Sequence, residues 1–329
     1  MIKRKLAAGI MLLVTTTALC SGCKLGKTAV VFTTTLSDKE VFRIEKEVCS
    51  IEEARVYLCN YQNIYGNAYG VNLWEHVSDS HSLEDYVKNI TISELTRVVC
   101  MDELAKKQEM TLTTEEKDKA AEAAAAYYAS LSKKEIAYMD VSESTLESMY
   151  EDYALAQKLY RSLTDGVNEE VSDDEARIME AMQIYVSSKE KADKVKADLD
   201  AGRDFTAVAT DYNEASKIEI TFGRGEMPSQ VEKAAFELDD DAISGCIKTD
   251  DGYYFIKCTN KFNQELTDAN KANIVKKREK EAFDDVYDSF VRGLDSTMNE
   301  KLWDQVEIKQ DKDITTNSFF EVYDEYFQS

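Results

Sequence analysis

Proline and histidine are scarce in this sequence, and glycine is not abundant. One proline, Pro228, and 12 glycines stand among 329 residues, which predicts long regular elements joined by few tight turns. The two histidines are His76 and His81. Two imidazoles argue against a histidine-based metal site and against a Ser-His-Asp triad elsewhere in the chain. We therefore expect no metal ion and no cofactor.

The apolar run near the N-terminus is too short to cross a membrane. Residues 6–19 form an uncharged run of 14 residues (19 − 6 + 1), whereas a transmembrane helix needs about 20. Basic residues 3–5 precede this run, and the small residues Ser21 and Gly22 follow it. This layout is that of a secretory signal rather than a membrane span.

Two cysteines, Cys20 and Cys23, lie at the end of this segment. The Ser-Gly-Cys that ends at Cys23 resembles a bacterial lipoprotein signal, in which the cysteine becomes the first mature residue and carries lipid. Cys20 does not fit this position, because Leu19 before it is too bulky for the cleavage site. The alternatives are an ordinary cleaved signal with two incidental thiols and a C-x-x-C metal site, which lacks a second Cys/His pair. We predict that residues 1–22 are a lipoprotein signal peptide and that Cys23 anchors the chain on the extracytoplasmic face of the plasma membrane.

Positive charge is also in short supply. Lys and Arg number 40 against 63 Asp and Glu, for a net charge of −23. The signal carries three positive charges and no acid, so the mature chain would have about −26 (−23 − 3). Such an acidic surface repels nucleic acid and anionic lipid headgroups. We expect no nucleic-acid partner, and we expect membrane contact only through lipid on Cys23.

The cysteines beyond the signal do not form a recognisable disulfide framework. Their number is odd and their spacing irregular: Cys49, Cys59, Cys100, Cys246 and Cys258. Free, packed thiols are therefore expected. A bridge between Cys246 and Cys258 stays an alternative, because these two flank a predicted hairpin.

The periodicity of the chain changes twice. Residues 29–36 and 40–50 are β-branched and predict strands or a hairpin. Capping patterns and apolar spacing then predict helices that begin at Ser50, Ser82, Thr113 and Ser142. An alternating stretch at 181–186 opens a block rich in strands and short helices, which ends near Asn260.

A long amphipathic helix is predicted from Thr267 onward. Its apolar stripe needs a partner, and the N-terminal helices are the simplest one. Residues 302–308 read as a closing strand, and the acidic, aromatic end is either docked or frayed. The predicted domains are residues 23–168 plus 263–312, an inserted block at 169–262, and a C-terminal tail at 313–329.

Four stretches within residues 181–258 follow one another in a recognisable order: AMQIYV, KADLDAGRDFTAVATDY, FGRGEMPSQVEKAAFEL and ISGCIKTDDGYYFIKC. This order resembles a parvulin-type (PpiC-like) peptidyl-prolyl isomerase domain. The whole layout resembles the PrsA-type foldase lipoproteins and, more loosely, the SurA-type chaperones. The resemblance implies an α+β fold, in which a mostly helical, discontinuous chaperone-like domain carries an inserted parvulin-like α/β domain with a small antiparallel sheet and flanking helices.

The resemblance also places the family's pocket, but most of its residues differ here. Gln183 and Tyr254 stand where the family has histidines, and Ala215, beside Glu214, stands where it has Asp or Cys. Val231 replaces the aromatic wall of the proline pocket, and only Met227 agrees with the family. We predict that Gln183 and Tyr254 hydrogen-bond each other as a structural pair, and that isomerase activity is absent or vestigial.

Three functions remain open at this stage. The resemblance implies a membrane-anchored chaperone or foldase whose partners are unfolded or nascent secreted polypeptides. The alternatives are an active prolyl isomerase with an altered pocket and a lipoprotein scaffold that binds one folded partner; a homodimer is also compatible with the sequence. Six tyrosines that could line a client-binding cleft are expected to be buried or half-buried instead: Tyr57, Tyr61, Tyr127, Tyr128, Tyr150 and Tyr153.

The lipid anchor can be tested directly. Metabolic labelling of the producing bacterium with a fatty acid should mark the protein, because the cysteine after the signal carries the lipid. The Cys23→Ala variant should be unlabelled, whereas Cys20→Ala should be labelled as the wild type is. Label on Cys23→Ala, or none on the wild type, would show that the motif is not used.

Overall fold

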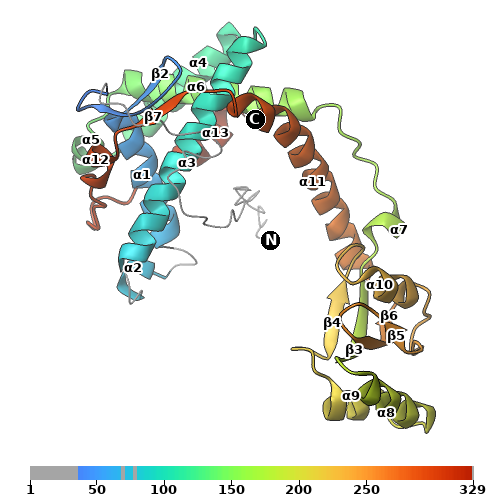
Figure 1. Cartoon of the computed structure of the whole chain (residues 1–329). Coiled ribbons are helices and arrows are strands. Elements are labelled where there is room, and N and C mark those ends of the chain that lie inside the picture. The colour runs from blue at the N-terminus through green and yellow to red at the C-terminus, as the bar shows by residue number, and fades with distance from the viewer. Residues whose placement is uncertain (1–35, 68–70, 77–79, 328–329) are drawn as a thin grey trace, which may run out of the picture. The chain divides into compact units, whose positions relative to one another are not determined.

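The structure is a computed structural model that describes residues 36–67, 71–76 and 80–327 (Figure 1). The chain forms two compact units. The first unit contains the residues up to Asp165 together with those from Phe283 onward, and the second contains Gly166–Ala282. The first unit is mostly helical and interrupted in sequence, and the second is an inserted α/β unit. The predicted fold class is therefore confirmed. Cys23 and the strand expected at 29–36 lie outside the described residues.

A small antiparallel sheet joins the two chain segments of the first unit. It has the strand order β2-β1-β7, with bounds β1 Glu40–Ile44, β2 Glu47–Ser50 and β7 Ser296–Met298. The β structure expected at 40–50 is confirmed, and it consists of two paired strands, β1 and β2. The strand expected at 302–308 is wrong, because Asn299 caps a short helix there, α12 Glu300–Asp304, and Trp303 is buried. The closing strand is β7, just before that cap.

The remaining elements of the first unit are helices. They are α1 Ile51–Gly66, α2 Leu73–His76, α3 Ser80–Lys107, α4 Thr114–Ser130, α5 Lys133–Met139, α6 Glu143–Thr164 and α13 Phe319–Phe327, with the end of α11 Gln264–Val291. The predicted capping boxes begin α1 and α4: the hydroxyls of Ser50 and Thr113 accept the backbone N–H three residues on, and the Glu there accepts in return. In the described part of the chain, no helix is both long enough and apolar enough to span a membrane.

The end of the chain is docked into the core of the first unit. The ring of Phe319 stacks on Tyr150 with centroids 4.3 Å apart, and the Tyr150 hydroxyl donates to the Phe319 carbonyl at 2.8 Å. Asn60 Oδ1 accepts the Phe319 N–H at 3.1 Å. Residues 319–327 are thus part of the helical unit rather than a separate tail. The prediction for the tyrosines is confirmed: all are buried or half-buried, Tyr127 and Tyr150 with no exposed surface.

The second unit is built on a four-stranded antiparallel sheet with the order β4-β3-β6-β5. Its elements are α7 Asp173–Ala176, β3 Met179–Val186, α8 Lys189–Asp200, α9 Phe205–Tyr212, β4 Glu219–Phe222, α10 Ser229–Phe236, β5 Ile247–Lys248 and β6 Tyr253–Asn260, with the start of α11. Alternate residues of β3 face opposite ways. Ile184 and Val186 pack with α8 and α9, whereas Met179 and Ala181 pack with α10.

The five described cysteines after the signal are all free. Four are buried and Cys246 is exposed. The thiols are thus free, as expected, but Cys246 is exposed and not packed.

Helix α11 has residues in both units. Near its start, the Thr267 hydroxyl accepts the Ile178 N–H at 3.1 Å, and the Asn270 amide donates to the Ala176 carbonyl at 2.9 Å. Near its end, Phe283 is buried against Tyr160, with ring centroids 5.2 Å apart. The predicted apolar stripe therefore packs on the N-terminal helices only in its later part, through Phe283, Tyr287 and Phe290. Val286 is exposed, and the stripe before Phe283 belongs to the second unit.

The first unit should fold without the second. Phe283 already contacts Tyr160, so residues 166–282 can be replaced by a flexible Gly-Ser linker of about six residues. We expect a helical circular dichroism spectrum and a single cooperative thermal transition. The same deletion with Phe283→Ala should lose about 3–5 kcal/mol of stability. A product that melts without cooperativity would contradict an independent helical unit.

Candidate functional site

The five positions that correspond to the parvulin pocket lie in the second unit. In the β3–β6 pairing, Gln183 is opposite Ile256, and Tyr185 is opposite Tyr254. Gln183 and Tyr254 therefore share one face of the sheet as diagonal neighbours, at a Cα spacing of about 7–8 Å. The structure keeps both positions on a common face, but not directly opposite each other.

The predicted hydrogen bond between Gln183 and Tyr254 is wrong. The Gln183 side-chain amide donates to the backbone carbonyl of Lys217 at 3.0 Å, and the residue is only 8% exposed. The Tyr254 ring packs against the Tyr185 ring, with centroids 4.9 Å apart. The reason is the register, because the loop after α9 runs along β3 and is closer to the amide than the diagonal tyrosine. Both side chains have structural partners.

The hairpin before β6 fixes where Tyr254 lies. Gly252 has φ +156°, and a Cβ there would lie 2.6 Å from the Val186 carbonyl oxygen. The Tyr185 hydroxyl donates to the Asp251 carbonyl at 2.7 Å across the same turn. Only glycine permits this close approach, so the turn clamps the ring pair of Tyr185 and Tyr254.

Ala215 lies in a turn held by Asn213. The Asn213 side-chain oxygen accepts the N–H groups of Tyr185 and Ala215, at 2.9 and 3.2 Å. Its neighbour Glu214 accepts the Ser187 N–H at 2.7 Å and pairs with Lys191. These contacts, the Lys191 bond first, lower the pKa of Glu214 to about 2. Glu214 is therefore a permanently charged structural residue and not a proton carrier.

The apolar side of the pocket is filled by the core of the unit. Val231 has no exposed surface and packs in the cluster of Phe222 and Cys258, with Met227 half-buried beside it. A valine in this position belongs to the core and presents no ring-sized wall. The structure thus brings Met227, Val231 and Tyr254 into one cluster. On the polar side, the Gln183 amide is bonded to a backbone carbonyl, and Ala215 has no polar side chain.

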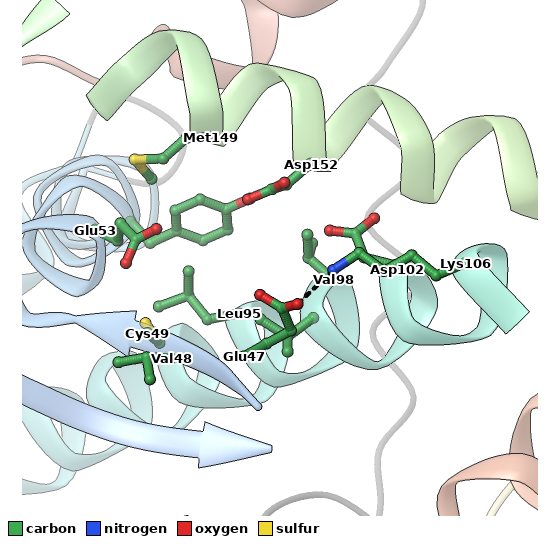
Figure 2. Close-up of a pocket in the computed structure, with 12 residues that line it drawn as sticks. Glu47, Val48, Cys49, Glu53, Leu95, Val98, Asp102, Lys106, Met149 and Asp152 are labelled. Carbon is green, nitrogen blue, oxygen red and sulfur yellow. Dashed lines mark hydrogen bonds and ion pairs between the residues drawn. The ribbon is translucent and has the colours of Figure 1, made fainter. Parts of the chain in front are cut away.

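A second candidate site lies in the first unit (Figure 2). It is a cavity of about 60 Å³, lined by residues of the β1–β2 hairpin, α1, α3 and α6. Its walls are apolar and mostly buried: Val48, Tyr57, Leu95, Val98 and Met149. Its charged residues are Glu47, Glu53, Asp102, Lys106 and Asp152. The cavity combines an apolar wall with an excess of carboxylates.

Asp102 is the unusual group of this cavity. It is 5% exposed, and its Oδ1 has no hydrogen-bond partner. Burial first, and then the charge of Asp152, raise the pKa of Asp102 to about 9. Desolvation and then Glu53 raise the pKa of Asp152 to about 7. Asp152 is itself exposed, so solvent screens its charge more than that of Asp102.

Other acids of the cavity are already engaged. Glu53 accepts the Ser50 N–H at 2.6 Å as part of the cap of α1. Glu47 pairs with Lys106 at 2.6 Å (Figure 2). Lys106 also contacts Glu103 at 3.2 Å. Among the described residues, no group of three or more His, Cys, Asp or Glu is arranged to hold a metal ion. Asp102 is thus a buried carboxyl with unfilled hydrogen-bonding capacity.

This cavity was not predicted from the sequence, although α3 carries one sign of it. The apolar stripe of α3 contains Leu95 and Val98, and Asp102 stands on the same face, seven and four residues later. A carboxylate on a buried helical face is costly unless it is paired. An unpaired acid on an apolar helical face therefore singles out Asp102, but the sequence does not predict which elements surround it.

Comparison with known proteins agrees with this architecture. Residues 141–273 match the PPIC-type PPIASE domain family. Foldase protein PrsA of Streptococcus mutans is 33% identical over 119 residues, covering 33% of this chain and 36% of the relative. Foldase protein PrsA 3 of Bacillus anthracis is 30% identical over 169 residues, covering 47% of this chain and 59% of the relative. Over part of its length, the chain is therefore similar to PrsA-type foldases and to the PPIC-type domain.

The similarity to these proteins covers only part of each chain. The chain spans less than two thirds of the length of either curated relative. A crystal structure of the peptidylprolyl isomerase PrsA from Bacillus cereus covers 75% of this chain and 94% of that chain, at 23% identity and a TM-score of 0.39. The family match begins at Val141, in the loop before α6 of the helical unit, and includes most of the second unit. We call the second unit the parvulin-type unit from here on.

The buried carboxyl of Asp102 should make stability depend on pH. Its pKa is about 9 in the folded protein and close to 3.8 in the unfolded chain, so the folded protein holds an extra proton between these values. The contribution of this group is fully present below about pH 4 and is lost as the pH rises through 9. Asp102→Asn should therefore raise the free energy of unfolding at pH 8 by about 1–3 kcal/mol, with little gain at pH 4.

Urea denaturation of wild type and variant across this range measures the effect. Asp118→Asn removes the same charge from an exposed position of α4 and should leave the slope unchanged. A variant less stable than the wild type at pH 8 would show that Asp102 is paired in solution.

Proposed function

We propose that the chain is an extracytoplasmic, membrane-anchored foldase that holds unfolded secreted polypeptides, with a parvulin-type unit that lacks efficient isomerase activity. The lack of efficient isomerase activity is inferred from the side chains at the pocket positions, which already have partners within the protein. The Gln183 amide is bonded to the Lys217 carbonyl, and Val231 is fully buried in the core. These contacts engage two of the positions that would grip a proline ring and polarise its carbonyl.

The size of the barrier to peptide-bond rotation supports the proposed lack of efficient isomerase activity. Rotation about a peptide bond has a barrier of about 18–20 kcal/mol, and a protein must lower it by placing groups around the twisted amide. A positioned acid, base or hydrogen-bond donor contributes about 10²-fold or more. With Gln183, Ala215 and Tyr254 in place of the family's polar groups, several such contributions are missing together.

Client binding is proposed on different grounds. Both curated relatives are named as foldases, and the helical unit of this chain has a cavity with apolar walls and carboxylates. Lipid on Cys23 would hold the molecule at the membrane from which secreted chains emerge, while the net charge of about −26 (−23 − 3) that remains without the signal keeps the body away from anionic headgroups. A scaffold that binds one folded partner has no comparable support.

We expect no isomerase activity above a mock-purified control in a protease-coupled assay on a proline peptide. The same preparation should suppress the aggregation of several unrelated unfolded proteins, because holding a chain does not need the prolyl pocket. Efficient isomerisation without aggregation suppression would overturn the proposal and favour an active isomerase.

A gain-of-function variant is the matched control. Gln183→His with Tyr254→His places two imidazoles on the shared sheet face, and Val231→Phe adds the ring wall. The phenylalanine enters a filled core and should cost about 1–3 kcal/mol, so the two-histidine variant is tested beside the triple variant. A rise in activity would support a retained parvulin frame, whereas no rise would place the loss in the loop around Lys217.

A further inference from the structure

The cavity between the β1–β2 hairpin, α1, α3 and α6 fits one chemical class of ligand. We propose that it binds the cationic side chain of an unfolded polypeptide, an arginine or a lysine, with the head group at Asp102. This inference rests on the proposed holding of unfolded chains and names the feature of the client that is recognised. It assigns the recognition to the helical unit and not to the parvulin-type unit.

Asp102 has a buried side-chain oxygen without a hydrogen-bond partner, which favours a ligand that supplies donors. A buried acceptor without a donor costs about 1–3 kcal/mol, and more when it is charged. Figure 2 shows Asp102 projecting from α3 toward α6, with Asp152 entering from α6. An incoming guanidinium or ammonium supplies the donors that the protein lacks, and such charge-assisted bonds are the strong ones.

The balance of charge selects a cation. The lining residues include four acids, Glu47, Glu53, Asp102 and Asp152, against the single charge of Lys106. Lys106 is paired with Glu47 and Glu103 and is therefore not free to neutralise Asp102. An anionic side chain entering this space would meet repulsion from Glu47 on β2 and Glu53 on α1.

The shape and the walls select a side chain instead of a bare ion. Tyr57, Leu95 and Met149 are buried apolar walls, which suit the methylene stem of lysine or arginine. A volume of about 60 Å³ holds roughly four to six groups of water size, at about 10–15 Å³ each. A guanidinium has four heavy atoms, so the cavity has room for a head group.

Access to the cavity comes from its outer rim. Val48 is 36% exposed, and Asp152 is exposed, whereas Asp102 lies deep. The exposed apolar Val48 can contact the backbone or a neighbouring side chain of an extended client. Asp152 attracts the cation at the rim, and Asp102 receives it at the end of the cavity.

Binding should release protons. The groups that face Asp102 are Asp152 from α6, Glu47 from β2, and Glu103 and Lys106 from α3; the acids raise its pKa and Lys106 lowers it. With a pKa of about 9, the carboxyl is protonated at neutral pH when the cavity is empty. A bound cation favours the carboxylate, so affinity for the cation should increase as the pH rises toward 9.

The test uses the purified protein and two fluorescein-labelled peptides with the sequence Gly-Ser-Leu-X-Leu-Ser-Gly. X is arginine in one peptide and citrulline in the other, which keeps the shape and removes the charge. Fluorescence anisotropy at pH 8 and physiological salt should show the arginine peptide bound about tenfold more tightly. Asp102→Asn should reduce this preference to less than about twofold, whereas Asp118→Asn, which removes an exposed charge of α4, should leave it intact.

Calorimetry in two buffers of different ionisation enthalpy adds a second readout. The arginine peptide should release protons at pH 7 on binding the wild type, and should release fewer on binding Asp102→Asn. Equal binding of both peptides by the wild type, an unchanged preference in Asp102→Asn, or the same loss in Asp118→Asn would each overturn the assignment. If aggregation suppression persists in those cases, only the cavity is reassigned. If suppression is absent too, the proposed function fails with it.

Discussion

The start of the last helix is the contact that joins the helices of the first unit to the end of the chain. Phe319 lies between Tyr127 and Tyr150, with ring centroids 5.4 and 4.3 Å away, and its backbone N–H is held by Asn60. These contacts join α1, α4 and α6 to a segment that is more than 150 residues later in the chain. Because α3 packs between α1 and α6, the position of Asp102 depends on these contacts.

A fixed helical frame explains how an unsatisfied carboxyl can persist. Asp102 stands on α3 beside the buried residues Met101 and Leu104, so turning its side chain to solvent would require the helix to move. The packing around α3 thus keeps the Asp102 carboxyl buried, at a cost in folding free energy. Such a cost is common where a protein keeps a group for binding rather than for stability.

The parts of the fold that depend on local chemistry were predictable. Ser50 and Thr113 begin helices because a capping box satisfies N–H groups within four residues, whatever the tertiary structure. The strand expected at 302–308 failed because Asn299 caps a helix at a place where β-branched residues also suit a strand. The partner of Gln183 could not be read from the sequence, since it depends on a strand register and on where the loop around Lys217 runs. The cavity could not be predicted either, because its lining comes from three helices and a hairpin whose relative positions depend on the tertiary structure.

The two units treat polar groups in opposite ways, and this difference bears on where ligands bind. On the parvulin-type face, Gln183 has a backbone partner and Tyr254 packs on Tyr185, so a ligand there would have to displace existing contacts. In the helical unit, Asp102 offers an oxygen that no described residue engages. A ligand gains most where its contacts replace none, because the desolvation cost has already been met on folding. A client is therefore expected to gain more from binding to the helical unit than from binding to the parvulin-type unit, although the parvulin-type unit has the more specific family match.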